Sequence, residues 1–289
     1  MRTKWQAALV VAVLLISVAG CALEPIEPEM GPDLSEASLS VHVMDVGQAD
    51  AILVLAAGKS MLIDGGNRTD TDLVKEYLRS QGVEQLDVVI GTHPHADHIG
   101  GLVEIINDFP VDKIYMPRVA HTSKTFEDLL TNIKNKGLKV TAAKAGTKID
   151  LGEEITAVFL SPSASSYEEL NNYSAVLKLT YQNTSFLFTG DAEAEVEKKL
   201  LASDANLSST VLKVAHHGSD SSSTADFLKA VQPDIAVISV GQDNTYGHPS
   251  TKVINRLQKA KAQILRTDVH GTVVLVSDGQ DVVATTDRE

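Results

Sequence analysis

The chain has 289 residues, of which 43% are hydrophobic, and this is enough for one sizeable core. Its formal net charge is -13, which does not suit broad, sequence-independent binding to nucleic acid, because phosphates demand clustered lysine and arginine. Cys21 is the single cysteine, so the composition excludes an internal disulfide and any thiolate metal ligand elsewhere in the chain.

Residues 1–21 have the organisation of a secretory signal. Two basic residues precede an apolar run, residues 7–18, that is too short to favour a membrane-spanning helix. The end of the run, Val-Ala-Gly-Cys, resembles a bacterial lipobox, which implies that Cys21 is lipidated; the alternative is an ordinary signal with a chance cysteine. Residues 22–38 are rich in Pro, Glu and Ser and are expected to form a flexible tether. We therefore expect a lipid-anchored protein on the extracytoplasmic face of the cell membrane, with one domain over residues 39–289.

The apolar patterns of that domain predict alternating strands and helices. In chain order we expect strands over 39–46, 51–55 and 60–64, a helix over 71–80, a strand over 86–91, a helix over 99–107, a strand over 113–116, a helix over 125–137, strands over 138–143, 155–161, 174–181 and 184–190, a helix over 193–202, a strand over 211–215, a helix over 224–231, a strand over 234–240, a helix over 250–262, and strands over 263–267, 271–277 and 281–286. A meander of strands followed by mixed β/α units indicates two sheets with helices outside.

Three histidines and an aspartate lie within residues 93–98, directly after an apolar strand. In extended backbone His93 and His95 point to the same side, so both imidazoles can reach one ion. Asp97 and His98 follow where the chain is expected to turn into a helix, and they can hold a second ion. Imidazole with carboxylate suits Zn²⁺ or a similar first-row metal. The alternative is a set of capping and surface side chains, which is disfavoured because this pattern at a strand end is rare by chance.

Other candidate ligands also follow predicted strands. They are Asp191, His216, His217 and His248. A carboxylate such as Asp191 can bridge two cations and hold them at the separation of about 3.5–4 Å that two-metal hydrolysis needs. His42 alternates within a strand, so we expect it to be a core or edge residue and not a ligand.

The segments H-x-H-x-D-H, TGD and HHGS, in this order, resemble those of the metallo-β-lactamase-fold hydrolases. MDVGQADA, LIDGG, HPHADHIGG, FTGD, LKVAHHGS and YGHPS look closer still to the extracellular hydrolase domain of the DNA-uptake competence protein ComEC, and they cover nearly all of residues 39–276. The phosphorylcholine esterases of bacterial surfaces are similar to the same branch. ComEC is a multi-span membrane channel, so this chain is expected to be a free-standing, lipid-anchored relative.

The resemblance implies an α/β fold, the four-layer αββα metallo-β-lactamase sandwich, with two divalent metal ions, Zn²⁺ or Mn²⁺, at one edge. The implied ligands are His93 and His95 for one ion, Asp97, His98 and His217 for the other, and Asp191 as a bridge. His217 is favoured only slightly over His216. Adjacent residues on an extended segment diverge, so the other histidine is expected to contact substrate.

Further residues are expected to support the site or the substrate. Asp64 would orient a ligand histidine or the attacking water. Asp45, Gln48 and Asp50 lie in a turn that the resemblance puts beside the site, with plain turn chemistry as the alternative for Gln48 and Asp50. Asn172 and Ser174 are expected on the substrate side.

One departure from the family favours phosphoester chemistry. Classical members carry another metal-binding histidine before the TGD segment, but no histidine lies between His121 and Asp191 here. One ion would then have more open positions, which accept water and phosphate oxygens.

We therefore expect a metal-dependent hydrolase, and we favour a phosphodiesterase or nuclease linked to DNA uptake. Asp97 or Asp191 would accept a proton from the nucleophile, and His248 or His216 would protonate the leaving oxygen. The expected partners are a phosphodiester substrate, such as single-stranded DNA or a choline-bearing wall polymer, and the membrane through the lipid anchor. Tyr167, Tyr173 and Tyr246 are the candidate stacking platforms for bases.

Two alternatives remain open from the sequence. One is a phosphorylcholine esterase or a thioester or carboxylic ester hydrolase. The other is a non-catalytic, metal-loaded binding protein at the cell surface.

Overall fold

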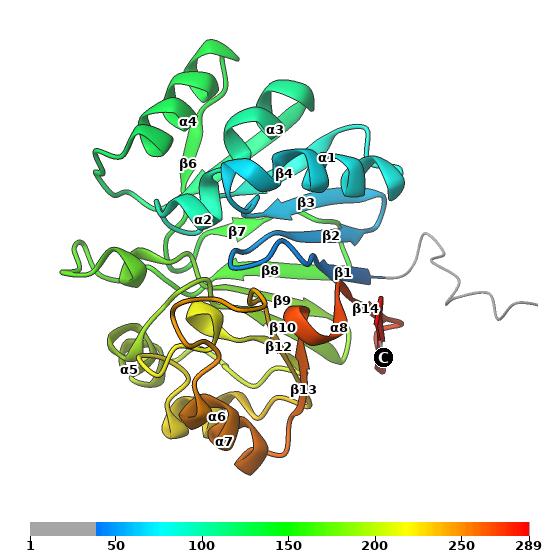
Figure 1. The fold of residues 1–289 in the computed structure, drawn as a ribbon, viewed down its shortest axis with the longest axis vertical. Helices are drawn as coiled ribbons and strands as arrows, with labels where there is room; N and C mark the ends of the chain where they lie inside the picture. The colour runs from blue at the N-terminus through cyan, green and yellow to red at the C-terminus, as the bar shows by residue number, and fades with distance from the viewer. Residues whose placement is uncertain (1–38, 289) are drawn as a thin grey trace, which may run out of the picture. The chain divides into compact units, whose positions relative to one another are not determined.

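The computed structural model describes residues 39–288, which form two β-sheets packed face to face with helices on both outer sides (Figure 1). The layers are therefore helix, sheet, sheet and helix, and the predicted αββα arrangement is confirmed. The expected signal, the lipidated Cys21 and the tether lie outside the described residues. Within residues 39–288, no helix is long and apolar enough to span a membrane.

Each sheet combines antiparallel and parallel pairings. The first sheet has the order β15 (Val282–Thr286), β14 (Val273–Ser277), β1 (Leu39–Val43), β2 (Ile52–Ala56), β3 (Lys59–Ile63), β4 (Leu86–Ile90), β5 (Val111–Met116) and β6 (Val140–Ala142). The second has the order β13 (Gln263–Arg266), β12 (Ile235–Ile238), β11 (Val211–Lys213), β10 (Thr184–Phe188), β9 (Leu177–Tyr181), β8 (Ile155–Phe159) and β7 (Lys148–Ile149). The parallel pairs run from β3 to β6 in the first sheet and from β10 to β13 in the second.

The helices divide between the two outer faces. The first sheet is covered by α1 (Thr71–Ser80), α2 (Ala96–Ile99), α3 (Leu102–Asp108) and α4 (Lys124–Asn135), and the second by α5 (Ala194–Leu201), α6 (Ala225–Val231) and α7 (Thr251–Lys259) (Figure 1). Shorter turns are α8 (Thr267–His270), η1 (Arg68–Asp70), η2 (Leu170–Tyr173) and η3 (Ala215–Gly218). Ser123, Thr224 and Ser250 cap α4, α6 and α7 by accepting a backbone N–H.

Three hydrophobic cores fill the spaces between the four layers. Within β10, Phe186 and Phe188 pack in the core between the sheets, and Leu187 packs against the α5–α7 side. Val88 and Val89 of β4 divide in the same way between the central core and the helices of the first face. Successive strand residues point to opposite faces. The strands are apolar on both faces because both are covered.

The predicted helix over 99–107 is wrong in one respect, since the chain breaks it into α2 and α3 at Gly100 and Gly101. A Cβ on Gly101 would lie 2.0 Å from the carbonyl oxygen of Gly65, so only glycine allows this approach. The break packs α2 against the segment that follows β3, and this contact brings the residues of both segments to one edge. The sequence patterns also missed β7, η2 and α8.

Candidate metal centre

Asp64 and the histidines and aspartates predicted for the metal site and the proton transfers follow five strands, β3, β4, β10, β11 and β12. β3 and β4 are parallel neighbours in the first sheet, and β10, β11 and β12 are parallel neighbours in the second. Open α/β sheets bind ligands outside the carboxyl ends of their parallel strands. Here the carboxyl ends from the two sheets meet, because His98 after β4 contacts Asp191 after β10.

Asp64 fixes the orientation of His98 from beneath the site. It follows β3 in a left-handed conformation with φ of 57° and is fully buried. Its carboxylate accepts hydrogen bonds from the Thr92 backbone N–H at 2.8 Å, the Thr92 hydroxyl at 2.6 Å and His98 Nδ1 at 2.8 Å. With Nδ1 engaged, Nε2 of His98 is left to face the site, as expected for a metal-ligating histidine held by a carboxylate.

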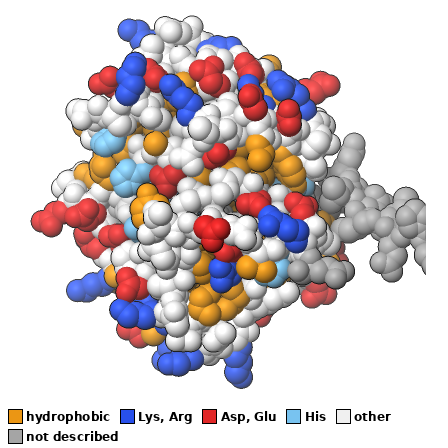
Figure 2. Space-filling model, in the orientation of Figure 1, with side chains coloured by type: hydrophobic (Ala, Val, Ile, Leu, Met, Phe, Trp, Pro, Cys, Tyr) orange, Lys and Arg blue, Asp and Glu red, His pale blue; other side chains and the backbone are white. Residues whose placement is uncertain are grey.

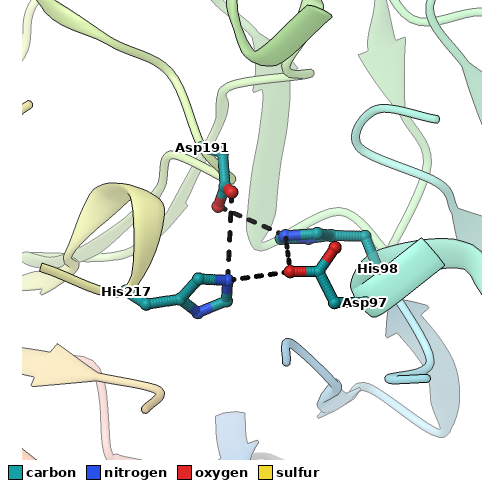
Figure 3. Close-up of side chains that lie close together, drawn as sticks. All are labelled: Asp97, His98, Asp191 and His217. Carbon is teal, nitrogen blue, oxygen red and sulfur yellow. Dashed lines mark ion pairs between the residues drawn. The ribbon is translucent and has the colours of Figure 1, made fainter. Parts of the chain in front are cut away.

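Four side chains converge above Asp64, and each offers one ligand atom within 4.8 Å of the others. Figure 3 shows Asp97 and His98 of α2 facing Asp191 and His217. His98 Nε2 lies 3.3 Å from Asp191 Oδ1, and His217 Nε2 lies 3.4 Å from Asp97 Oδ2. We call these four residues the ligand cluster. They are the residues predicted for the second ion together with the predicted bridge.

The ligand cluster fits a divalent cation, because several of its buried nitrogen and oxygen atoms have no hydrogen-bond partner. Among the described residues, His98 Nε2, Asp191 Oδ1 and His217 Nε2 are buried and lack a hydrogen-bond partner. Each such atom costs about 1–3 kcal/mol when left unsatisfied, and here they face one another. Nδ1 of His217 is occupied by the carbonyl oxygen of Ser239 at 3.0 Å, so its Nε2 is also directed at the cluster. Two imidazoles and two carboxylates are a donor set typical of first-row metals.

The charges of the cluster also favour a cation. Burial raises the pKa of Asp191, but His98 and His217 outweigh burial and hold this pKa well below its usual range. Burial lowers the pKa of His98, yet Asp191 and Asp64 raise it to well above the ordinary value. The buried carboxylates therefore attract positive charge to this point.

The pair predicted for the other ion lies next to Asp191. His93 is buried, and its Nε2 is 3.8 Å from Asp191 Oδ2 and 3.0 Å from His95 Nδ1. Burial lowers the pKa of both His93 and His95, which favours the neutral imidazole that a metal ligand requires. Their binding to a common ion stays a prediction. The ring of His121 lies 6.5 Å from that of His95, a proximity that the sequence did not indicate.

His216 and His217 diverge for a different reason from the one expected. The segment is not extended: both residues adopt left-handed conformations, with φ of 50° and 51°, inside η3. His217 is buried in the ligand cluster, and His216 is partly exposed with Nδ1 3.2 Å from the Ser221 hydroxyl. Nε2 of each ring is 3.8 Å from Asp191 Oδ2, so the preference for His217 as ligand rests on burial and on its contact with Asp97.

A cavity of about 330 Å³ opens above the ligand cluster. It is lined by Gln48, His95, Ala96, Asp97, Asn171, Asp191, His216, His217, Tyr246 and His248. Figure 2 shows histidine side chains gathered on the left of the molecule, near the place of α2 in Figure 1, with carboxylates beside them. The cavity places the predicted His216, His248 and Gln48 around the predicted metal site.

Three residues expected on the substrate side or beside the site lie elsewhere. Asn172 and Ser174 are buried and do not line the cavity: Asn172 Oδ1 accepts from the Glu193 backbone N–H at 3.1 Å, and Ser174 Oγ accepts from that of Asp191 at 3.0 Å. They hold the Asp191 loop in place, so the substrate-side expectation is wrong for both. Asp45 pairs with Arg288 and also lies outside the cavity lining.

Asp50 lies behind the site and is not part of the cavity lining. Its Oδ2 accepts from Lys213 Nζ at 2.7 Å, and both side chains are buried. Its Oδ1 is 3.5 Å from His217 Nδ1. Sequence reasoning missed Lys213 and the cavity-lining Asn171. A lysine within the apolar strand that precedes HHGS was the available signal for Lys213; nothing distinguished Asn171 from Asn172.

The sequence profile of the metallo-β-lactamase superfamily matches residues 44–242. The chain is 30% identical over 251 residues to ComE operon protein 3 of Bacillus subtilis (strain 168), covering 81% of this chain and 32% of that protein. It is 31% identical over 280 residues to competence protein ComA of Neisseria gonorrhoeae, covering 92% of this chain and 37% of that protein. The chain thus spans about a third of the length of the curated relatives it matches.

The fold has counterparts among solved structures. The metallo-β-lactamase fold protein YhfI of Bacillus subtilis superposes with a TM-score of 0.52 at 12% identity, over 86% of this chain and 100% of that one. At this identity the likeness shows the fold alone, and it agrees with the two-sheet sandwich. The predicted resemblance is confirmed: the chain belongs to the metallo-β-lactamase superfamily of metal-dependent hydrolases and has competence proteins among its relatives.

Proposed function

We propose that this protein is a phosphodiesterase that cleaves nucleic-acid strands outside the cytoplasm. The observation that carries the proposal is the ligand cluster, whose unpaired imidazole and carboxylate atoms lie at the base of a small open cavity. Two divalent ions, Zn²⁺ or Mn²⁺, would be held by the ligand cluster and by His93 and His95. The nucleic-acid substrate is supported by relatives that are named competence proteins.

When bound, divalent cations supply Lewis acidity, which lowers the pKa of water toward neutrality and offsets charge on phosphoryl oxygens. Side chains of the protein would accept and donate the protons of the reaction. Asp97 and Asp191 line the cavity as carboxylates, and either can accept the proton of the attacking water. On the wall, His216 has Nδ1 engaged by Ser221 and can direct Nε2 toward a leaving oxygen. His248 is the second candidate donor, and its ring lies 5.7 Å from that of His216.

Position in the cell forms part of the same proposal. The apolar run of residues 7–18 and the cysteine at 21 support export and a lipid anchor at the extracytoplasmic face. Residues 22–38 would then hold the domain near the membrane surface.

Hydrolysis assays with a panel of substrates test the function. The purified protein is incubated with Mn²⁺ or Zn²⁺ and bis-p-nitrophenyl phosphate, single-stranded DNA, p-nitrophenyl phosphorylcholine or a thioester. We expect turnover of the first two, with Asp191→Asn at least about 100-fold slower because it removes a charge at the reaction centre. Asp204→Asn is the matched control, because Asp204 is an exposed carboxylate outside the cavity.

Three outcomes would contradict parts of the proposal. Absence of phosphodiester turnover by the unmodified protein removes the proposed activity. Turnover confined to the phosphorylcholine ester or the thioester assigns the protein to those hydrolases. Metal bound without turnover of any substrate, with metal content measured by mass spectrometry, identifies a binding protein.

A further inference from the structure

Three aromatic rings form one wall of the cavity and lead from the ligand cluster to solvent. His216 is the innermost ring, with Nε2 3.8 Å from Asp191 Oδ2. The ring centroid of His248 lies 5.7 Å from that of His216, and the ring of Tyr246 stacks beside His248 at 5.9 Å with an interplanar angle of 18°. We call these three residues the ring wall. It ends in Tyr246, which at 71% is the most exposed large hydrophobic side chain of the described residues.

The segment that carries the ring wall's outer end is held in place by a local hydrogen-bond network. Asn244 Nδ2 donates to the carbonyl oxygens of Gly241 at 3.0 Å and His248 at 2.6 Å, and its Oδ1 accepts from the His248 N–H at 3.0 Å. Gln48 Oε1 accepts from the Gly241 N–H at 3.1 Å and ties the segment to the other side of the cavity. Tyr246 is therefore an exposed ring on a fixed support, which lowers the ordering cost of binding.

The charges around the cavity limit what this ring can bind. No lysine or arginine is among the described residues that line the cavity, and the whole chain carries a net charge of -13. A phosphate chain therefore gains little from cationic side chains here. Base stacking on an aromatic face is the remaining source of affinity for a strand, and it contributes about 1–3 kcal/mol per base.

The aromatic content of the cavity favours a planar ligand over a quaternary ammonium. Recognition of choline uses cages of several aromatic rings. Apart from histidines, Tyr246 is the single aromatic residue among the described lining residues. Tyr167 and Tyr173 contact each other and do not line the cavity, and the Tyr167 hydroxyl accepts hydrogen bonds from the backbone N–H groups of residues 163 and 164. A single exposed tyrosine ring therefore suits the stacking of one planar base.

We propose that Tyr246 is a nucleobase subsite. With the scissile phosphate at Asp191, the base of the adjoining nucleotide stacks on Tyr246 at the outer end of the ring wall. The substrate is single-stranded, because a paired base within a duplex presents no free face to the ring. The subsite rests on the proposed phosphodiesterase function and adds to it the class of strand that is bound.

The test compares Tyr246→Ala and Tyr246→Phe on two oligonucleotides of the same length, one with all its bases and one abasic next to the cleaved bond. We expect Tyr246→Ala to raise KM on the base-bearing strand about tenfold with little change in kcat, because stacking binds the ground state and transition state alike. Tyr246→Phe keeps the ring and restores KM. Val283→Ala is the control, because Val283 is 57% exposed on β15 and does not line the cavity.

The abasic strand provides the decisive comparison. We expect its KM to be high and insensitive to Tyr246→Ala. An equal rise in KM on both strands, or no rise on the base-bearing strand, overturns the subsite. A larger rise on p-nitrophenyl phosphorylcholine than on the oligonucleotide also overturns it and makes the ring an ammonium site.

Binding without turnover separates this inference from the proposed function. Fluorescence anisotropy of a labelled single-stranded oligonucleotide is measured with EDTA-treated protein. We expect about tenfold weaker binding by Tyr246→Ala than by the unmodified protein or Tyr246→Phe. Binding that depends on Tyr246 in a protein that cleaves no phosphodiester supports the subsite and refutes the activity. Phosphodiester cleavage that is unchanged by Tyr246→Ala supports the activity and refutes the subsite.

Discussion

Replacing Lys213 with methionine should destabilise the protein strongly, because it leaves Asp50 as an uncompensated charge behind the metal centre. Lys213 Nζ lies 2.7 Å from Asp50 Oδ2, and the two side chains are 1% and 2% exposed. Solvent therefore screens this pair very little. At an effective dielectric constant of about 20, charges at this separation attract by about 6 kcal/mol, part of which offsets their desolvation.

We expect Lys213→Met to lower the free energy of unfolding by about 3–5 kcal/mol, the usual loss when one partner of a buried pair is removed. For a chain of this size the corresponding fall in Tm is about 6–20 °C. Asp50 also lies 3.5 Å from His217 Nδ1, so an unbalanced carboxylate would disturb a predicted ligand. The double variant Lys213→Met/Asp50→Asn removes both charges and should recover most of the loss.

Urea unfolding of the metal-free protein measures the effect in the unmodified chain, the two single variants and the double variant. The double-mutant cycle isolates the coupling between Lys213 and Asp50. A coupling energy below about 1 kcal/mol, or a double variant as unstable as Lys213→Met, would refute the reasoning from burial.

Three further predictions follow from the geometry. His217→Ala should lose one bound divalent ion per chain by mass spectrometry and His216→Ala should keep it, because only His217 belongs to the ligand cluster; equal loss in both would contradict the assignment. Gly101→Ala should lower the free energy of unfolding by about 1–3 kcal/mol, since its Cβ would meet the Gly65 carbonyl oxygen at 2.0 Å, and an unchanged urea midpoint would disprove that contact. Burial lowers the pKa of His42 from 6.5 to about 4, so the unfolded state binds more protons between these values, and stability present above pH 6.5 is lost as the pH falls toward 4. His42→Gln should remove about 3 kcal/mol of this pH dependence in urea titrations, and identical pH profiles would rule the effect out.

The sequence predicted the features that depend on local pattern. Nearly continuous apolar runs predicted the strands, because both faces of each sheet are covered. The cluster at His93 and His98 was recognisable because strand ends gather at one edge of an α/β fold. Asp191 and His217 were found by the same logic, and the structure brings both beside His98.

The remainder depends on tertiary contacts that no local pattern carries. Asn171 lines the cavity and Asn172 does not, because η2 turns one side chain toward the site and the next toward the Asp191 loop. The left-handed backbone of His216 and His217 inside η3 is likewise not indicated by the residue types at these positions. The role of Lys213 follows only from its buried ion pair with Asp50, which is distant in the sequence.

The ligand cluster takes half of its members from each sheet: Asp97 and His98 follow β4, and Asp191 and His217 follow β10 and β11. An ion bound by all four residues would link the two sheets of the sandwich. Its binding would raise the free energy of unfolding, by an amount that grows with the logarithm of the free ion concentration once the site is nearly saturated. The concentration of the free ion would thus set how firmly the two sheets are held together at this edge, as well as the activity of the site.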